Sequence, residues 1–307
     1  MKRKIGKKSR APAFASSRHP HARSGSDGRV HLDLLRDPAS GQAFVALRTA
    51  IFDEAWQNEI AGAAANTAYA SLEGRPSVTR AVELARNMMA QTSRLSDGFL
   101  SRAPAGAVAC KAGCAHCCYQ AVGVTAPEAL AVFDYLAKTL STAELASVAA
   151  RVAEARERTR GLSAAERFSP EHPCVFLESG RCSIYEVRPL SCRGMNSLDA
   201  AECEKRLNEP EARAEFLATG AGSRSFMEPI RAFHAVSAGL QLGLAELYRL
   251  DMRPLDLIAA IHLIFTRGES AARDWIAGRA SFESARGGDS TNEFGIHDVS
   301  GRVEPTR

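Results

Sequence analysis

The stretch Cys110-Lys-Ala-Gly-Cys114-Ala-His-Cys117-Cys118 holds four of the chain's eight cysteines within nine residues. Spacings of two or three intervening residues allow a loop to fold back so that successive thiolates face one metal ion. Gly113 gives the backbone the freedom that such a turn needs. Adjacent side chains usually diverge, so Cys117 and Cys118 seldom bind the same mononuclear centre. The pair therefore predicts that one of them is not a ligand, or that two metal ions or a polynuclear cluster share the loop.

The other four cysteines fall within thirty residues further along the chain. Residues 175–177 and 182–185 flank Glu178-Ser-Gly-Arg181, a pattern that predicts a short β-hairpin. With the turn centred on the Ser-Gly pair, we expect Cys174 and Cys182 to lie opposite one another. The predicted metal ligands are Cys110, Cys114, Cys117, Cys118, Cys174, Cys182, Cys192 and Cys203.

Two other interpretations of the cysteines are weaker. Free cysteine is a common small buried residue, and this alternative applies best to Cys203, whose surroundings look helical. Structural disulfides need an oxidising compartment, but the N-terminus has no apolar stretch of the secretory type. No segment reaches the roughly 18 apolar residues that span a bilayer. We therefore expect a cytoplasmic protein, with no membrane contact, whose thiols bind metal.

Charged and polar residues accompany the second cysteine group. Four thiolates around zinc or a four-iron cluster leave about two negative charges. Arginines beside the ligands can offset this charge by donating N–H groups to sulfur. We expect Arg188 and Arg193 to act in this way, and we expect Tyr185 to lie beside the ligands with them. Imidazole is a normal zinc ligand, but with eight thiols present His116 and His172 are better interpreted as polar neighbours.

The order of these motifs resembles that of a known family. Cys114-x2-Cys117-Cys118 is followed by Pro173-Cys174 and then by Cys182-Ser-Ile-Tyr185-Glu-Val-Arg188-Pro189-Leu-Ser-Cys192-Arg193. Over roughly residues 106–205 this arrangement is similar to the CxxCxxCC family of zinc- or iron-chelating proteins, which are also called YkgJ-like. One spacing differs, because three residues rather than two separate the first two cysteines. The resemblance implies an eight-cysteine site for zinc or iron, often described as an iron–sulfur site, and it fixes no reaction.

The remainder of the chain predicts helices. Alanine is abundant and β-branched residues are sparse, which favours helix. Ser141 with Glu144, and Ser163 with Glu166, have the spacing of capping boxes, and Thr125 can cap a further helix. Apolar periodicity predicts helices over residues 43–70, 78–95, 199–207, 211–218, 226–249, 254–267 and 269–281. The predicted fold is mainly α: a helical body with a central cysteine-rich loop and a short β-hairpin that form the metal site.

Composition divides the chain into five predicted parts. These are a disordered basic arm (1–40), an N-terminal helical segment (41–100), the cysteine-cluster metal-binding domain (101–207), a C-terminal helical segment (208–285) and a flexible tail (286–307). The arm carries nine Lys or Arg residues against one acid over residues 1–29. It lacks interleaved aromatics, so we expect a solvated tail and no nucleic-acid partner. Metal ions are the expected partners, and the arm could also contact an acidic protein.

Three functions remain open on the sequence alone. The first is a metal-binding protein with zinc or iron, or with a 4Fe-4S cluster, whose reaction is unknown. The second is a cluster-dependent enzyme that modifies proteins or carries out redox chemistry, since flagellin lysine N-methylases carry a similar cysteine domain. The third is a zinc-stabilised interaction module with a basic arm. The first three cysteines also have the spacing of radical S-adenosylmethionine enzymes, but the alternating β/α units of those enzymes are absent.

Overall fold

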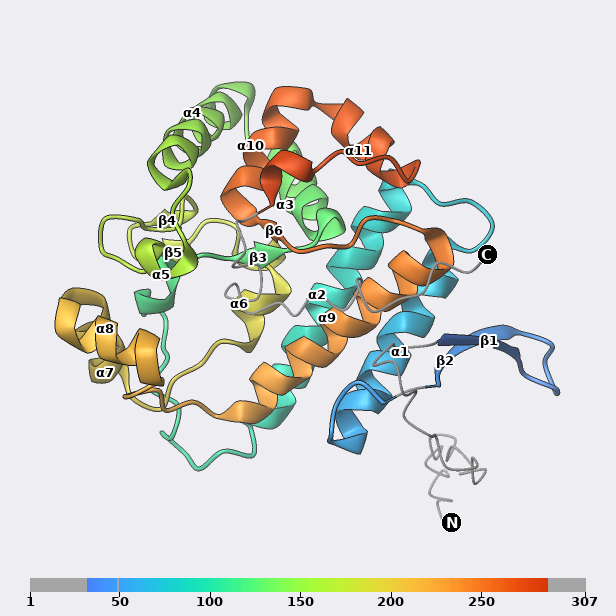
Figure 1. Ribbon diagram of the computed structural model, residues 1–307, viewed down its shortest axis with the longest axis horizontal. Coiled ribbons are helices and arrows are strands. Elements are labelled where there is room, and N and C mark those ends of the chain that lie inside the picture. Colours follow the sequence, from blue (N-terminus) through green and yellow to red (C-terminus); the bar gives the residue numbers. More distant parts are fainter. Residues whose placement is uncertain (1–31, 49, 287–307) are drawn as a thin grey trace, which may run out of the picture.

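The computed structural model describes residues 32–48 and 50–286, and over these residues the protein is mainly α-helical, as predicted (Figure 1). The predicted arm up to residue 31 and the predicted tail from residue 287 lie outside the described residues. The α-helices are α1 Ala55–Leu72, α2 Val78–Leu100, α3 Ala126–Thr139, α4 Thr142–Thr159, α5 Ala164–Arg167, α6 Leu190–Gly194, α7 Ala200–Asn208, α8 Pro210–Thr219, α9 Met227–Tyr248, α10 Leu257–Arg267 and α11 Glu269–Ile276. Short strands form two-stranded sheets: β1 Leu32–Arg36 with β2 Ala43–Leu47, β3 Gly123–Val124 with β6 Leu255–Asp256, and β4 Leu177–Glu178 with β5 Arg181–Cys182.

The first described segment differs from the sequence prediction. A helix was predicted from residue 43, but strands β1 and β2 form an antiparallel hairpin and the first helix begins only at Ala55. Strand β1 also occupies the end of the segment predicted to be a disordered arm. The turn between the strands is closed by Asp37, whose Oδ1 accepts the amide of Ser40 at 2.7 Å. Val45 is buried against α1 in a small apolar cluster. Alanine content predicted helix here, but the Asp37 turn lets the chain fold back on itself instead.

Helices α1 and α9 form the closest packing in the core. They run in the same direction, since Gln57 donates to the carbonyl of Arg231 near one end and Tyr248 donates to the carbonyl of Tyr69 near the other. Between these ends Gly239 faces α1 so closely that a Cβ added to it would lie 2.1 Å from the Ala61 carbonyl oxygen. Small residues on both helices therefore set their separation.

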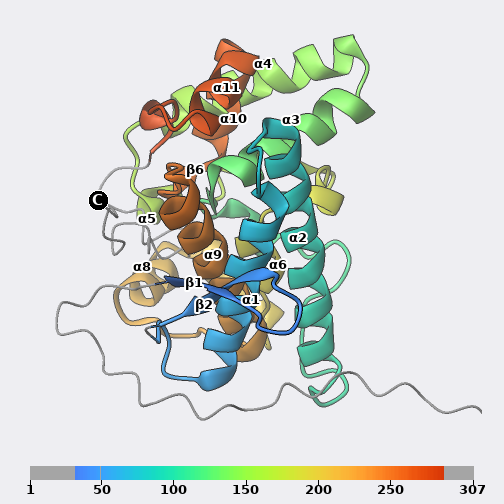
Figure 2. The same cartoon turned by 90° about the vertical axis from the view of Figure 1, so that its right-hand side faces the viewer.

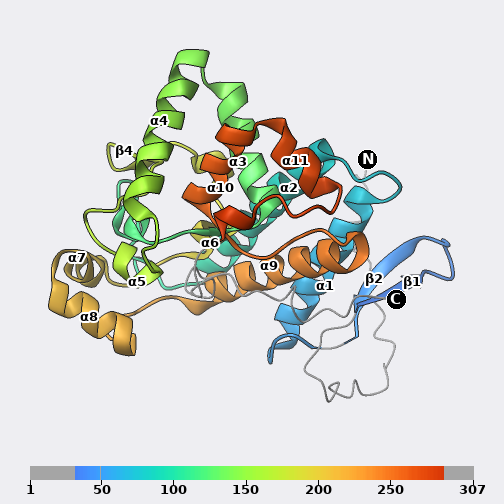
Figure 3. The ribbon, with the colours of Figure 1, turned by 45° about the horizontal axis from the view of Figure 1, so that its top comes forward.

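The other helices assemble on this pair in two groups. Helix α2 packs against α9 and α3, while α10 packs against α3 and α4. Figure 2 shows α3, α4, α10 and α11 together above α1 and α9, with the upper end of α2 beside α3. Helices α7 and α8 lie at the end of the molecule opposite the β1–β2 hairpin, as Figures 1 and 3 show. None of the described helices combines the length and apolarity needed to cross a bilayer.

Local capping explains where several helices begin. Ser141 with Glu144 and Ser163 with Glu166 form the predicted capping boxes, which start α4 and α5. Thr125 caps α3 with Glu128, which lies three residues later. Each of these signals lies within four residues of sequence. The structure confirms the predicted capping boxes, and predicting them needed no knowledge of tertiary contacts.

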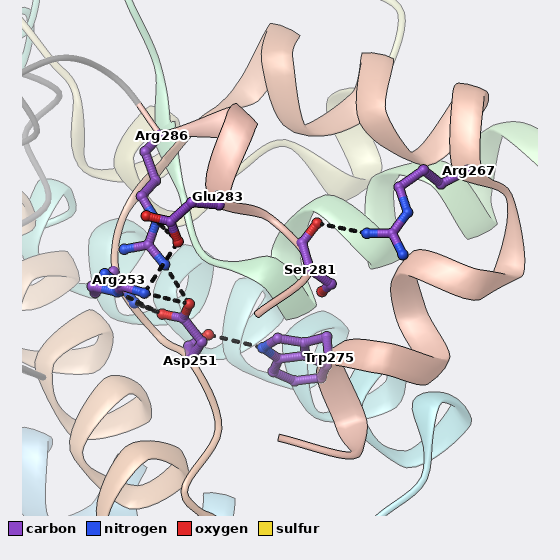
Figure 4. Close-up of polar contacts among 7 residues, drawn as sticks. All are labelled: Asp251, Arg253, Arg267, Trp275, Ser281, Glu283 and Arg286. Atoms are coloured by element: carbon purple, nitrogen blue, oxygen red, sulfur yellow. Dashed lines mark hydrogen bonds and ion pairs between the residues drawn. The ribbon is translucent and has the colours of Figure 1, made fainter. Parts of the chain in front are cut away.

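A polar network fixes the last described residues on the helical body (Figure 4). The indole of Trp275 donates to the carbonyl of Asp251 at 2.8 Å, and the Asp251 carboxylate forms ion pairs with Arg253 and Arg286. Arg253 and Arg286 both also pair with Glu283. The loop between α9 and α10 is thereby joined to the segment after α11.

Candidate metal centre

The loop that carries the first cysteines is shaped by short local bonds. Gly113 adopts φ +87°, a conformation that side chains disfavour, and the amide of Cys114 donates to the carbonyl of Lys111 at 2.9 Å. A short 3-10 helix, His116–Tyr119, follows and contains the adjacent cysteine pair. The tight turn that the sequence predicted at Gly113 is therefore present.

Cys110 is held against a distant part of the chain. The amide of Ala109 donates to the Ser197 carbonyl at 2.8 Å. In return, the amide of Ser197 donates to the sulfur of Cys110 at 3.2 Å. This contact attaches the start of the cysteine loop to the segment between α6 and α7.

The predicted β-hairpin is present as β4 and β5, with a two-residue turn at Ser179 and Gly180. Both turn residues have positive φ, +48° and +74°, as the tightest hairpin turns require. The register corrects one expectation: Cys182 pairs with Leu177, so Cys174 does not lie directly opposite it. With a two-residue turn, Glu178 lies opposite Arg181 and Leu177 lies opposite Cys182. Cys174 lies three residues before the start of β4.

Two further contacts position the hairpin cysteines. The amide of Cys174 donates to the carbonyl of Cys118 at 2.7 Å, which joins the hairpin to the first cysteine loop. The backbone amides of Phe176 and Ile184 donate to the sulfurs of Cys174 and Cys182 respectively. In each case the donor lies two residues after the cysteine. N–H donation of this kind stabilises a thiolate, and so prepares the sulfur to bind a metal ion.

Helix α6 brings Cys192 to the hairpin, and a buried carboxylate fixes its position. Glu128 is fully buried, and its Oε1 accepts the amide of Leu190 at 2.9 Å. Its Oε2 accepts the amide and hydroxyl of Thr125 at 2.9 and 2.7 Å. Burial raises the pKa of Glu128 above its ordinary value. One carboxylate therefore ties the start of α3 to the start of α6.

Helix α7 contributes Cys203. The side chain of Asp199 caps this helix by accepting the amides of Ala201 and Glu202. One turn after the cysteine, Arg206 Nη2 donates to the Cys203 sulfur at 3.2 Å. The helix also packs against the 3-10 helix that carries Cys117 and Cys118. Cys203 thus faces the first cysteine loop, although it is the last cysteine in the sequence.

All eight cysteines are free thiols, and the surroundings of five of them favour the protonated form. Burial raises the pKa of Cys174 and of Cys192 to about 12, and it also raises the pKa of Cys110 and Cys182. A hydrogen bond with Cys118 raises the pKa of Cys117 well above its ordinary value. A metal ion that binds these sulfurs must therefore displace protons.

Electrostatic neighbours among the thiols define two sets. Cys110 interacts with Cys114, Cys117 and Cys203. Cys192 interacts with Cys182 and Cys117, and Cys174 interacts with Cys182 and Cys192. Cys117 is common to both sets, and Cys118 is hydrogen-bonded to it. Among the described residues no three potential ligands are arranged as a ready-made metal site, so the thiols would have to turn toward a common centre on binding.

The polar residues predicted around the ligands are present, but their contacts differ from the prediction. Arg193 donates to the carbonyls of Arg188 and Glu186 and to the hydroxyl of Ser93, so it joins the segment before α6 to α2 rather than bonding a sulfur. The Arg188 guanidinium lies 4.5 Å above the Tyr185 ring. From there it lowers the pKa of Cys182 and Cys192 by its charge.

Three functional contacts were not identified from the sequence. Arg206 donates to the sulfur of Cys203, and its position three residues after this cysteine on a helix is a signal that could have been used. Glu128 could have been found as the partner of a capping threonine, but its bond to α6 spans 62 residues and could not. The contact made by the Ser197 amide has no sequence signal, because every residue except proline has a backbone N–H group.

Free thiols come from a loop, a hairpin and two helices, with N–H donors directed at four of the sulfurs, and this makes the central part of the chain a thiol-rich domain. Residues 109–212 match the model of the CxxCxxCC family, described as a "Putative zinc- or iron-chelating domain", which confirms the resemblance found in the sequence. The match covers about a third of the chain. No curated protein and no solved structure matches the chain.

Proposed function

We propose that the protein binds zinc or iron through its cysteine thiolates and that the metal holds the central domain together. The observation that carries this proposal is that eight free thiols occur in four segments between residues 110 and 203. Backbone contacts and the packing of α7 on the 3-10 helix join these segments to one another. The ligands are Cys110, Cys114, Cys117, Cys118, Cys174, Cys182, Cys192 and Cys203.

The donor chemistry supports a thiolate metal site. Sulfur ligands suit zinc, ferrous iron and iron–sulfur clusters, and not magnesium or calcium. The amides of Ser197, Phe176 and Ile184 each donate to a cysteine sulfur, as does the guanidinium of Arg206. Such donors disperse the negative charge that the ligands keep after the metal has bound.

The metal would supply cross-links that the short elements of this domain lack. Strands β4 and β5 are two residues each, and α6 has five residues, so little regular hydrogen bonding holds them. Binding free energy at a structural thiolate site acts as folding free energy, about 10–16 kcal/mol for zinc in small peptides. The proposed role of the centre is therefore to stabilise the fold of this domain. A 4Fe-4S cluster would add electron transfer to it.

The test is anaerobic purification followed by measurement of zinc, iron and acid-labile sulfide per chain. We expect bound zinc or iron, with sulfide only if a cluster is present. The variant Cys174→Ser should lose metal, whereas Ala271→Ser should keep it. Ala271 is fully buried in α11, away from the thiols, so this control introduces a hydroxyl into the core without removing a ligand. Wild-type protein that takes up neither zinc nor iron under anaerobic conditions would refute the proposal.

A further inference from the structure

We infer that the thiols form two separate four-thiolate centres, an inner one built on Cys174, Cys182 and Cys192 and an outer, exchangeable one built on Cys110, Cys114 and Cys203. The adjacent cysteines 117 and 118 lie between the two sets and supply one ligand to each. This inference rests on the proposed metal-binding function and adds to it the number of centres, their ligands and their accessibility.

The number of thiols is sufficient for two centres. Zinc in a structural site takes four ligands, and an iron–sulfur cluster is also held by four cysteines. Eight thiols in one region are twice what either needs. Cys117 and Cys118 are hydrogen-bonded to each other, and because adjacent side chains usually diverge, the two seldom bind one mononuclear centre. The adjacent pair can therefore supply one ligand to each of two neighbouring centres.

The inner set lies against the hydrophobic core. Cys174 and Cys182 pack on the main cluster of buried residues, beside Phe176 and Ile184, which are 0% and 1% exposed. Cys192 follows the buried start of α6, which Glu128 fixes. The surroundings of these three sulfurs are therefore held by α3, α6 and the β4–β5 hairpin.

The outer set lines an open cavity. Cys110, Cys114, Cys117 and Cys203 contribute to the walls of a cavity of about 100 Å³, and Cys110 and Cys117 are exposed. Its other walls include the rings of Phe168 and Phe216, which meet edge to face at 5.9 Å, and the polar side chains of Ser223 and Ser225. A small chelator or an exchanging ligand can enter here.

The two sets are also carried by different elements. The outer ligands come from the cysteine loop and α7, and α7 packs against α8 at the end of the molecule. Cys110 is held by the Ser197 amide and Cys203 by Arg206, both outside the hairpin. Loss of the outer metal can thus leave α6 and the hairpin in place, whereas loss of the inner metal releases the hairpin.

The experiment uses the full chain loaded with Zn²⁺ under anaerobic conditions and challenged with excess EDTA. We expect two zinc ions per chain, released in two phases of equal amplitude. During the fast phase iodoacetamide should alkylate Cys110, Cys114 and Cys203, as mapped by mass spectrometry, while Cys174, Cys182 and Cys192 react only in the slow phase. This readout needs no variant, so a folding defect cannot obscure it.

Variants then assign the phases. Cys203→Ser should abolish the fast phase and keep one zinc, and Ala271→Ser should keep both phases. A single zinc per chain, a single release phase, or alkylation of the inner thiols first would overturn the inference while leaving the proposed function intact. Absence of any bound zinc or iron would instead refute the proposed function, and the inference would fall with it.

Discussion

Substitution of Gly239 by alanine tests whether the close packing of α1 and α9 sets the stability of the helical body. The added Cβ would lie 2.1 Å from the carbonyl oxygen of Ala61 and 2.7 Å from the Cβ of Ala64. Carbon–oxygen contacts shorter than about 3.3 Å are rare, so the helices must separate locally by about 1 Å. Neither obstructing atom can rotate away, because one belongs to the backbone and the other to an alanine.

Two opposing terms set the size of the effect. Alanine is favoured over glycine within a helix by about 1 kcal/mol, while overpacking of a filled core costs about 1–3 kcal/mol and occasionally more. Since both helices must move, we expect the overpacking cost to lie at the upper end of this range, at about 3 kcal/mol. After the gain of about 1 kcal/mol from alanine, Gly239→Ala should lower the free energy of unfolding by about 2 kcal/mol. At about 2–4 °C per kcal/mol, Tm should fall by about 4–8 °C.

The matched control is Gly98→Ala on α2. Gly98 is exposed and an added Cβ there meets no heavy atom within 4 Å, so only the helical preference operates and stability should rise by about 0.5–1 kcal/mol. Urea denaturation followed by circular dichroism at 222 nm measures both variants with metal loading held equal. If Gly239→Ala were as stable as Gly98→Ala, the packing argument for α1 and α9 would be wrong.

Three further perturbations connect the fold with the candidate centre. In Gly194→Ala the new Cβ would lie 2.2 Å from the ring of Phe233, so we expect a loss of about 1–3 kcal/mol and weaker zinc binding in a competition assay, because α6 carries a proposed ligand; unchanged affinity would contradict this. Burial raises the pKa of Glu128 above its ordinary 4.5, so the folded protein binds this proton more tightly than the unfolded chain. Lowering the pH from neutral through the raised pKa should stabilise the wild type relative to Glu128→Gln in urea titrations, most fully below pH 4.5, and a pH-independent difference would count against it. Arg167→Leu leaves the carboxylate of Asp256 buried without its ion-pair partner and should cost about 3–5 kcal/mol in the same titration; a loss below 1 kcal/mol would show that the pair contributes little.

Part of the site followed from local sequence because its signals are local. Gly113 and Gly180 adopt the positive φ angles that glycine allows, and capping boxes start α4 and α5 as predicted. The prediction failed at residues 43–47, where alanines favour helix but the Asp37 turn and the packing of Val45 on α1 select a strand. Tertiary contacts outweigh helix propensities, which differ by less than about 1 kcal/mol per residue.

The sequence alone determined that this protein is mainly helical and that its eight cysteines belong to one domain, since periodicity, caps and cysteine spacing are properties of short segments. Only the tertiary structure decided which thiols are neighbours. Cys110 meets Cys203 across 93 residues of chain because the Ser197 amide and the packing of α7 bring them together. The pairing of distant segments depends on contacts whose partners no local pattern specifies, and for that reason the division of the thiols into two sets required the fold.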